Sequence, residues 1–155
     1  MNRLTKMIVS LFGIGFIPLA PGTVGSFFSI IFFYIIFEYF SFVNIIIIFL
    51  FTFFISLKLI NLYSSLSNKY DPSEIVIDEF LGINFIFIFY EYFKFTNDIF
   101  MFVLIFIIFR LFDIIKFFPA NWIDKNIKNS WGVILDDVVA GFYCVIILYT
   151  LNVFI

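Results

Sequence analysis

Two adjacent pairs of acidic residues stand out in this apolar sequence: Asp78 with Glu79, and Asp136 with Asp137. Carboxylates can bind a divalent cation, act as general bases or attack an electrophilic centre. Each pair also has a structural explanation, because the helix dipole favours acidic residues in the first turn of any helix. That explanation suits one pair better than two. We therefore take these four residues as candidates for a functional site.

A third charged group consists of Arg110, Asp113 and Lys116, and its spacing of three residues places the side chains on one side of a helix. The chain contains no histidine, which removes the commonest general base and a common zinc ligand. Cys144 lies in an apolar run, where a buried hydrophobic role is expected rather than a reactive thiol. The remaining ligands are hard oxygen atoms, which select Mg²⁺, Mn²⁺ or Ca²⁺, with Mg²⁺ as the default.

The composition indicates that membrane helices position these residues. Of the 155 residues, 64% are hydrophobic and 13% are charged, and a soluble domain of this size cannot hide so much apolar surface. Residues 7–37, 39–57 and 138–155 carry no charge. A bilayer-spanning helix needs about 20 mostly apolar residues, so these runs are typical of membrane segments.

The expected fold class is all-α, an integral membrane helical bundle with about four to five spans that forms a single domain over residues 1–155. Glycine and proline are concentrated between Ser10 and Ser26, which predicts a broken N-terminal segment with a loop at 18–25. Residues 7–17 either span the membrane or lie on its surface. The other expected elements are a helical hairpin (24–37 and 42–60), spans at 74–93, 99–115 and 132–153, polar loops at 61–73 and 116–130, and a turn at 94–98.

The basic residues predict the orientation of these spans. Lys94 alone falls on one side, whereas six fall on the other: Arg3, Lys6, Lys69, Lys116, Lys125 and Lys128. The side rich in lysine and arginine is cytoplasmic. Every candidate site residue lies within about two helical turns of that side. Ionised groups in a bilayer cost at least a few kcal/mol each and usually face a partner or a wet cavity. We therefore expect the five carboxylates to converge on a shared divalent cation: Asp78, Glu79, Asp113, Asp136 and Asp137.

Four sequence blocks resemble one known family. In order, they are PLAPGTVGS at 18–26, DPSEIVIDEFLG at 71–82, FRLFDIIKFFP at 109–119 and WGVILDDVVAG at 131–141. Together they resemble phosphatidylglycerophosphatase A, a bacterial membrane enzyme that converts phosphatidylglycerophosphate to phosphatidylglycerol. The resemblance implies a Mg²⁺-dependent phosphatase of phospholipid biosynthesis, multi-pass in the inner (cytoplasmic) membrane, with its active site facing the cytoplasm. One difference is that Phe117 and Phe118 separate Lys116 from Pro119, whereas in the family a proline follows the lysine directly.

The resemblance also implies roles for individual residues. The catalytic and metal-binding set would be Asp78, Glu79, Asp113, Asp136 and Asp137. Arg110 and Lys116 would hold the phosphate oxygens, and backbone amides of the small-residue loop would cradle them. That loop contributes Gly22, Thr23, Gly25 and Ser26, next to Pro21. Attack by water and attack by an aspartate carboxylate both remain open as mechanisms.

Other functional classes remain as alternatives. A cation transporter or channel would also place carboxylates in the membrane, but here the charges cluster at one face of the bundle. Another lipid-phosphate hydrolase, a headgroup transferase and a non-catalytic assembly factor are the remaining candidates. The net charge is −2 with no basic stripe, so a nucleic acid is not an expected partner. The expected partner is a membrane phospholipid substrate, and the sequence does not determine the oligomeric state.

Overall fold

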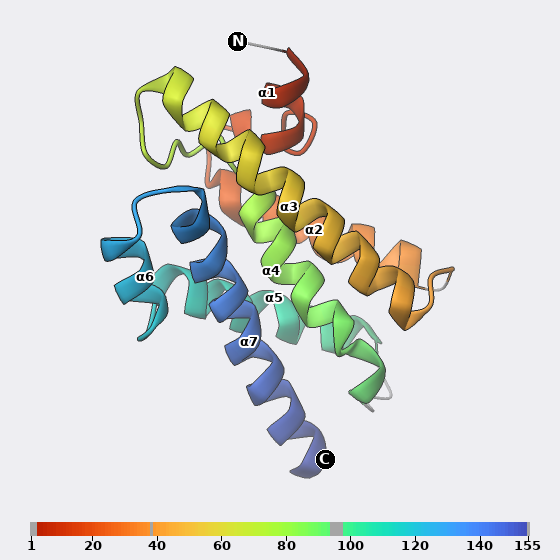
Figure 1. The fold of residues 1–155 in the computed structure, drawn as a ribbon. Coiled ribbons are helices and arrows are strands. Elements are labelled where there is room, and N and C mark those ends of the chain that lie inside the picture. Colours follow the sequence, from red (N-terminus) through yellow and green to blue (C-terminus); the bar gives the residue numbers. More distant parts are fainter. Residues whose placement is uncertain (1–2, 38, 94–97, 155) are drawn as a thin grey trace.

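The computed structural model describes residues 3–37, 39–93 and 98–154, and every regular element within these ranges is a helix (Figure 1). The all-α expectation is therefore confirmed for the described part of the chain. Two short 3₁₀ turns are η1 (Ile14–Phe16) and η2 (Tyr90–Tyr92). The α-helices are α1 (Arg3–Val9), α2 (Pro21–Phe37), α3 (Phe42–Ser67), α4 (Ile77–Ile88), α5 (Asp98–Ile115), α6 (Ala120–Asn126) and α7 (Ser130–Phe154).

Within the described residues, α3 and α7 are the two helices long and apolar enough to cross a membrane. α2 is also apolar but has only 17 residues. α4 has 12 residues, because the chain is irregular up to Val76 and turns into η2 after Phe89. At 1.5 Å per residue α4 is about 18 Å long, short of a hydrocarbon core of about 30 Å. The span expected at 74–93 is thus shorter than predicted, and the number of spans stays a prediction.

The central helix of the bundle is α4, which packs against α2, α3 and α7. Its closest approach to α7 is at Gly82 and Gly141. A Cβ atom at Gly141 would lie 2.6 Å from the carbonyl oxygen of Gly82, and one at Gly82 would lie 2.8 Å from that of Asp137. Small residues let helix backbones approach closely in a membrane. This crossing brings Asp137 on α7 beside the first turns of α4.

Aromatic side chains fill the end of the bundle opposite to the acidic pairs. Phe33 of α2 and Phe87 of α4 are fully buried, with ring centroids 5.4 Å apart. Phe87 stacks on Tyr90 at 5.2 Å, and Tyr90 contacts Phe37 at 4.6 Å. These aromatic contacts therefore occupy one end of the α2–α4 pair, and the candidate charged residues lie at the other end.

The N-terminal Pro/Gly segment differs from the expected loop at 18–25. The structure starts α2 at Pro21, so the small residues predicted to form a loop belong to the first turns of a helix. Proline is favoured at the first helical position, because its missing N–H would have been unpaired there. Ala20, just before the helix, has a left-handed backbone (φ 51°) that turns the chain into α2.

Two expected polar loops also contain helix. α3 continues to Ser67 instead of ending near residue 60, and α6 occupies the middle of the loop at 116–130. In both places polar residues lie on exposed helical turns, which composition alone does not distinguish from a loop. The turn expected at 94–98 falls mainly on residues 94–97, which lie outside the described residues.

Residues 7–17 do not form one continuous helix. The chain leaves α1 at Val9, passes through three left-handed residues and then forms η1. The carbonyl oxygen of Val9 accepts a hydrogen bond from the N–H of Val76 at 3.0 Å, and Gly15 packs closely against the backbone of Glu74. This segment therefore packs on the chain that leads into α4, and its helices are too short to span a bilayer.

Candidate functional site

All five expected carboxylates line one cavity of about 350 Å³. The cavity lies where the beginning of α2, the beginning of α4, the end of α5 and the second turn of α7 meet. Its lining residues are Ala20, Pro21, Gly22, Asp71, Ser73, Ile75, Asp78, Glu79, Arg110, Asp113, Ile114, Lys116, Val133, Asp136 and Asp137. Residues separated by more than 100 positions thus contribute to one site, as their common depth in the predicted bundle suggests.

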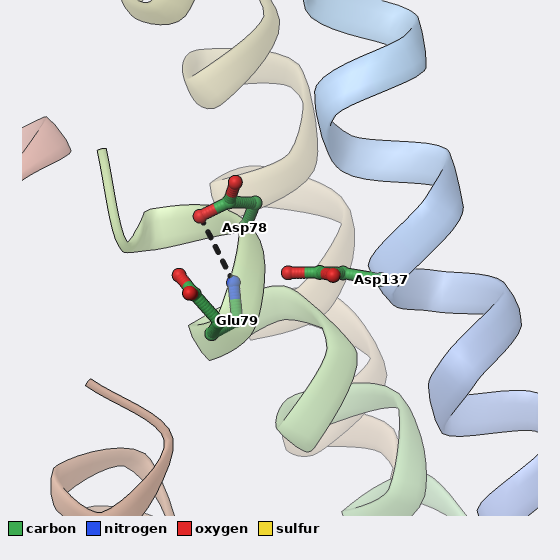
Figure 2. A group of neighbouring side chains, drawn as sticks. All are labelled: Asp78, Glu79 and Asp137. Atoms are coloured by element: carbon green, nitrogen blue, oxygen red, sulfur yellow. Dashed lines mark hydrogen bonds between the residues drawn. The ribbon is translucent and has the colours of Figure 1, made fainter. Parts of the chain in front are cut away.

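Three of the carboxylates form a tight cluster, shown in Figure 2: Asp78, Glu79 and Asp137. One oxygen from each lies within 4.8 Å of the others. Asp78 and Glu79 come from the first turn of α4, where Asp78 accepts a hydrogen bond from the N–H of Glu79 at 3.1 Å. Asp137 extends from α7 toward them (Figure 2). Asp78 and Asp137 are only 8% and 4% exposed, so solvent contributes little to screening their charges.

The other two carboxylates contact the cations of the cavity. Arg110 forms an ion pair with Asp113, one turn further along α5. Lys116 contacts Asp136 at 2.5 Å and also Asp124 of α6 at 3.1 Å. Asp113 and Asp136 therefore each contact a cation more closely than any member of the three-carboxylate cluster does among the described ion pairs.

Arg110 connects the paired carboxylates to the cluster. Its Nη1 lies 3.8 Å from Oε1 of Glu79 and donates a hydrogen bond of 3.4 Å to Oγ of Ser26 on α2. The Ser26 hydroxyl in turn donates to the carbonyl oxygen of Gly22 at 2.8 Å. The guanidinium is thus held between α5, α4 and α2, at the inner edge of the cavity.

Backbone geometry at the end of α5 places Lys116. Its φ of 49° is left-handed, a conformation that costs an L-residue other than glycine roughly 1–2 kcal/mol. The N–H of Lys116 still completes the helix by bonding to the carbonyl oxygen of Phe112 at 2.9 Å. The helix ends at this residue, and the side chain meets Asp136 and Asp124 from later elements.

The electrostatics of the loop residues follow from burial and from these pairs. Burial lowers the pKa of Lys116, but Asp136 and Asp124 raise it more, so the net pKa is above its usual value and the ammonium stays charged. Burial raises the pKa of Asp71, although the charge of Lys116 opposes this. Burial also raises the pKa of Tyr70 to about 12, with Asp136 adding to the effect. Tyr70 is therefore a neutral hydrogen-bond donor near neutral pH.

The carboxylate cluster fits a hard divalent cation. The three oxygens lie within 4.8 Å of one another. This is close to the diameter of a ligand shell in which each metal–oxygen distance is about 2.0–2.6 Å. Oε2 of Glu79 is buried and has no hydrogen-bond partner among the described residues. A buried polar oxygen without a partner is costly, and a bound cation would satisfy it. The donors are all oxygens, as Mg²⁺ prefers.

The small residues of α2 divide into two groups. Gly22 lines the cavity, and a Cβ atom there would overlap the carboxylate of Glu79 and lie 3.3 Å from Nη1 of Arg110. The hydroxyl of Ser26 accepts the hydrogen bond from Arg110. Gly25 instead packs against Val76, where a Cβ atom would meet that of Val76 at 3.0 Å. Thr23 and Gly25 are not among the described lining residues, so the expected cradle for phosphate is limited to the start of α2.

Sequence reasoning missed some residues of the cavity. Asp71 and Ser73 line it although they precede α4 in the chain, and Asp124 contributes the second ion pair of Lys116. Asp71 opens the DPSEIVIDEFLG block, so its place in that block was an available signal. Asp124 lies in a polar segment among other charged residues, and nothing in its sequence context distinguishes it.

Comparisons with known proteins find one family and several relatives. A family model described as phosphatidylglycerophosphatase A matches residues 7–152. The chain is 31% identical over 138 residues to Phosphatidylglycerophosphatase A of Escherichia coli (strain K12), covering 89% of this chain and 77% of the relative. It is 28% identical over 141 residues to Phosphatidylglycerophosphatase A of Haemophilus influenzae, covering 91% and 84%.

A third relative has a different name. The chain is 32% identical over 150 residues to a Bacteroides thetaiotaomicron protein named as a candidate phosphatidylinositol-3-phosphatase, covering 94% of this chain and 91% of the relative. No solved structure matches the chain significantly. The names of all three relatives describe phosphatases of phosphorylated lipid headgroups.

Proposed function

The chain belongs to the phosphatidylglycerophosphatase A family, and from this premise we propose that it is a Mg²⁺-dependent phosphatase that hydrolyses phosphatidylglycerophosphate to phosphatidylglycerol and phosphate. It is a phosphoric monoester hydrolase of phospholipid biosynthesis. The observation that carries the proposal is the single cavity in which three clustered carboxylates lie beside Arg110 and Lys116. Such a cavity combines a site for a cation with a site for the phosphate dianion.

We assign the binding of the cation to Asp78, Glu79 and Asp137, whose oxygens converge. When bound, Mg²⁺ supplies Lewis-acid polarisation of the phosphoryl group and lowers the pKa of water. Asp113 and Asp136, which the sequence also suggests as ligands, are oriented by Arg110 and Lys116. They are therefore placed to hold these cations and to accept a proton at the cavity wall.

We assign phosphate binding to Arg110, Lys116 and the first turn of α2. Arg110 offers N–H donors that match phosphate oxygens, and its contact with Ser26 fixes its direction. The unpaired N–H groups of the first turn of a helix favour an anion, and Gly22 allows the phosphate to approach the backbone there. These groups stabilise the negative charge that spreads over the non-bridging oxygens during transfer.

The attacking group is either water or an aspartate carboxylate of the cavity. The two routes differ in whether a covalent phospho-aspartyl enzyme forms. Brief reaction with substrate labelled in its terminal phosphate, followed by acid quenching, separates them. Label that stays with the protein supports carboxylate attack, and its absence at saturating substrate supports attack by water.

We further propose that the protein is a multi-pass component of the bacterial inner membrane with the cavity facing the cytoplasm. Support comes from the apolar length of α3 and α7 and from the exposed basic residues near the cavity end, such as Lys69, Lys125 and Lys128. Trp122 and Trp131, which are 52% and 46% exposed, lie at this same end. Tryptophan is enriched where a membrane meets water, so these residues support a cavity near the headgroup region.

The decisive experiment measures phosphate release by the purified protein in detergent micelles containing phosphatidylglycerophosphate. We expect activity with Mg²⁺, none in excess EDTA, and recovery when Mg²⁺ is restored. Phosphatidylinositol 3-phosphate serves as a second substrate, because one relative bears that name. Full activity in EDTA would exclude the metal mechanism, and a clear preference for the inositol lipid would reassign the substrate. Release from neither lipid would contradict the proposed function.

A further inference from the structure

A groove lined by apolar side chains runs between α2 and α5, next to the charged cavity. Its volume is about 410 Å³. Ile30 on its floor is 4% exposed, whereas Phe27 and Ile107 on its rims are 56% and 55% exposed. The groove is therefore closed at its base and open along its side. The residues that shape it include Phe27, Ile31 and Tyr34 of α2 and Val103, Phe106 and Ile107 of α5.

The groove and the charged cavity lie on the same face of α5. Phe106 and Ile107 line the groove, and Asp113 and Ile114, seven residues later, line the cavity. A separation of seven residues returns to nearly the same side of a helix. The groove therefore continues the cavity along α5.

Side-chain contacts between α2 and α5 mark the boundary between the two spaces. The last polar contact is between Nη1 of Arg110 and Oγ of Ser26, at 3.4 Å. Phe106, one turn before Arg110 on α5, meets Phe27, the residue after Ser26, edge to face, with centroids 6.0 Å apart. Arg110 and Phe106 are four residues apart and so lie on one side of α5. A phosphate that binds Arg110 thus lies about one helical turn from the groove.

We propose that this groove binds an acyl chain of the lipid substrate while the terminal phosphate occupies the charged cavity. The inference rests on the proposed function and adds a subsite to it. Gly22 and Tyr34 are 12 residues apart, or about 18 Å along α2, similar to the roughly 15 Å depth of hydrocarbon in one leaflet. The described lining residues carry no charge, as a hydrocarbon chain requires. A lipid could therefore reach the cavity sideways without leaving the membrane.

The groove orients the bound lipid, and it does not attract the acyl chain by the hydrophobic effect. Surrounding lipid tails are as apolar as the groove, so transfer of a chain into it supplies packing contacts and little hydrophobic energy. Fixing one chain restricts the rotation of the headgroup and favours productive placement of the phosphate. The groove would thus distinguish a long-chain lipid from a phosphomonoester with short chains.

A kinetic test compares dipalmitoyl with dibutyryl phosphatidylglycerophosphate, using the full-length protein in detergent micelles. Ile31→Trp and Val103→Trp each fill the groove, and Ile47→Trp on α3 is the matched control because Ile47 is 57% exposed outside the groove. We expect the long-chain to short-chain ratio of kcat/KM to fall on the order of five-fold in the groove variants, the scale of one or two packing contacts in a membrane. The control should keep the wild-type ratio. An unchanged ratio in both groove variants would overturn the subsite, whereas an inactive wild type would contradict the proposed function.

A binding test does not require turnover. Phosphatidylglycerophosphate with a diazirine near the end of one acyl chain is photolysed in phosphatidylcholine vesicles that contain the wild-type protein, and adducts are mapped by peptide mass spectrometry. We expect adducts at 27–34 and 102–107 that excess unlabelled phosphatidylglycerophosphate removes. Adducts spread over the exposed face of α3 and insensitive to this competitor would indicate ordinary surrounding lipid, and would overturn the proposal.

Discussion

At the residue scale, the five carboxylates of the cavity differ in what balances their charge. Two of them pair with Arg110 and Lys116. For the other three, the one ion pair among the described residues joins Glu79 to Arg110, with Oε1 and Nη1 3.8 Å apart. Buried charges without partners are costly, and their mutual repulsion adds to the cost. Neutralising one member of the cluster should therefore harm activity without harming the fold, whereas removing Asp113 or Asp136 takes away one of the two carboxylates that Arg110 or Lys116 contacts.

The clearest test is Asp137→Asn. We expect at least about a 100-fold loss of kcat, comparable to the removal of a main electrostatic group from an active site. The melting temperature without metal should stay the same or rise, because repulsion is relieved. The increase in melting temperature that Mg²⁺ causes in the wild type should disappear, since ligand binding stabilises only a protein that retains the site.

Thermal unfolding with and without Mg²⁺, together with phosphate release, measures these effects. Glu91→Gln is the matched control, because Glu91 is exposed in η2 at the other end of α4. It should match the wild type in both measurements. An Asp137→Asn protein that remained active, with a normal response to Mg²⁺, would remove Asp137 from the metal site.

A second residue-scale prediction concerns Gly22→Ala. The new methyl group would overlap the Glu79 carboxylate, which is the flexible end of a side chain and therefore moves away. We expect little change in stability but a loss of activity on the order of 100-fold, because displacing a catalytic group by about 1 Å can cost that much. Gly25→Ala is the control, since its methyl group would meet Val76 instead. Phosphate release that is equally impaired in both variants would contradict this role for Gly22.

At the element scale, the crossing of α4 with α7 decides whether the cluster exists. Asp78 and Glu79 begin α4, and Asp137 lies four residues before Gly141 on α7. The two backbones approach through Gly82 and Gly141, where a side chain would meet a carbonyl oxygen. The small residues of these helices therefore set the distance between carboxylates from different elements.

Gly141→Ala tests the crossing. Its Cβ atom would lie 2.6 Å from the carbonyl oxygen of Gly82, a backbone atom that cannot move alone. We expect the helices to separate and stability to fall by about 1–3 kcal/mol, the usual cost of overpacking. Activity should fall too, because Asp137 moves away from α4. Thermal unfolding in micelles measures the effect against Ile146→Ala on the exposed side of α7, which should retain wild-type activity. A fully stable and active Gly141→Ala protein would show that the close crossing is not required.

At the scale of the whole molecule, charge is concentrated at one end and aromatic packing at the other. The cavity and the exposed basic residues share the first end, and the Phe33–Phe87 contact lies toward the second. This asymmetry predicts a single orientation in the bilayer, with the basic end in the cytoplasm. The substrate would then be drawn from the inner leaflet.

Labelling of single cysteines tests the orientation. Lys125→Cys and Glu91→Cys place thiols at exposed positions at the two ends, each in a Cys144→Ser background. A membrane-impermeant thiol reagent should label Lys125→Cys only in inside-out vesicles and Glu91→Cys only in right-side-out vesicles. Each variant should first be shown to retain phosphate release. Reversed labelling would put the cavity on the outer face and contradict a cytoplasmic site.

The helical class and the starts of three long helices can be predicted from composition and charge spacing alone. Long uncharged runs favour helices in a membrane because the backbone must satisfy its own hydrogen bonds there. α3, α5 and α7 accordingly begin within two residues of their expected starts. The sequence also predicted that the five carboxylates lie together, since charges in an apolar chain must lie at a common depth or lose hydration, but it missed Asp71 and Ser73 of the same cavity. It could not locate the start of α2 at Pro21, because Pro and Gly occur both in loops and at helix starts.

The pairing of the charged residues depends instead on how the helices pack. Residue spacing shows which side chains share one side of a helix. Which neighbouring helix that side meets depends on how the helices cross. The Gly82–Gly141 approach turns Asp137 toward α4, while the left-handed Lys116 meets Asp136 and leaves it outside the three-carboxylate cluster. The division of five similar carboxylates into a cluster of three and two that pair closely with Arg110 and Lys116 therefore follows from packing, which no local pattern encodes.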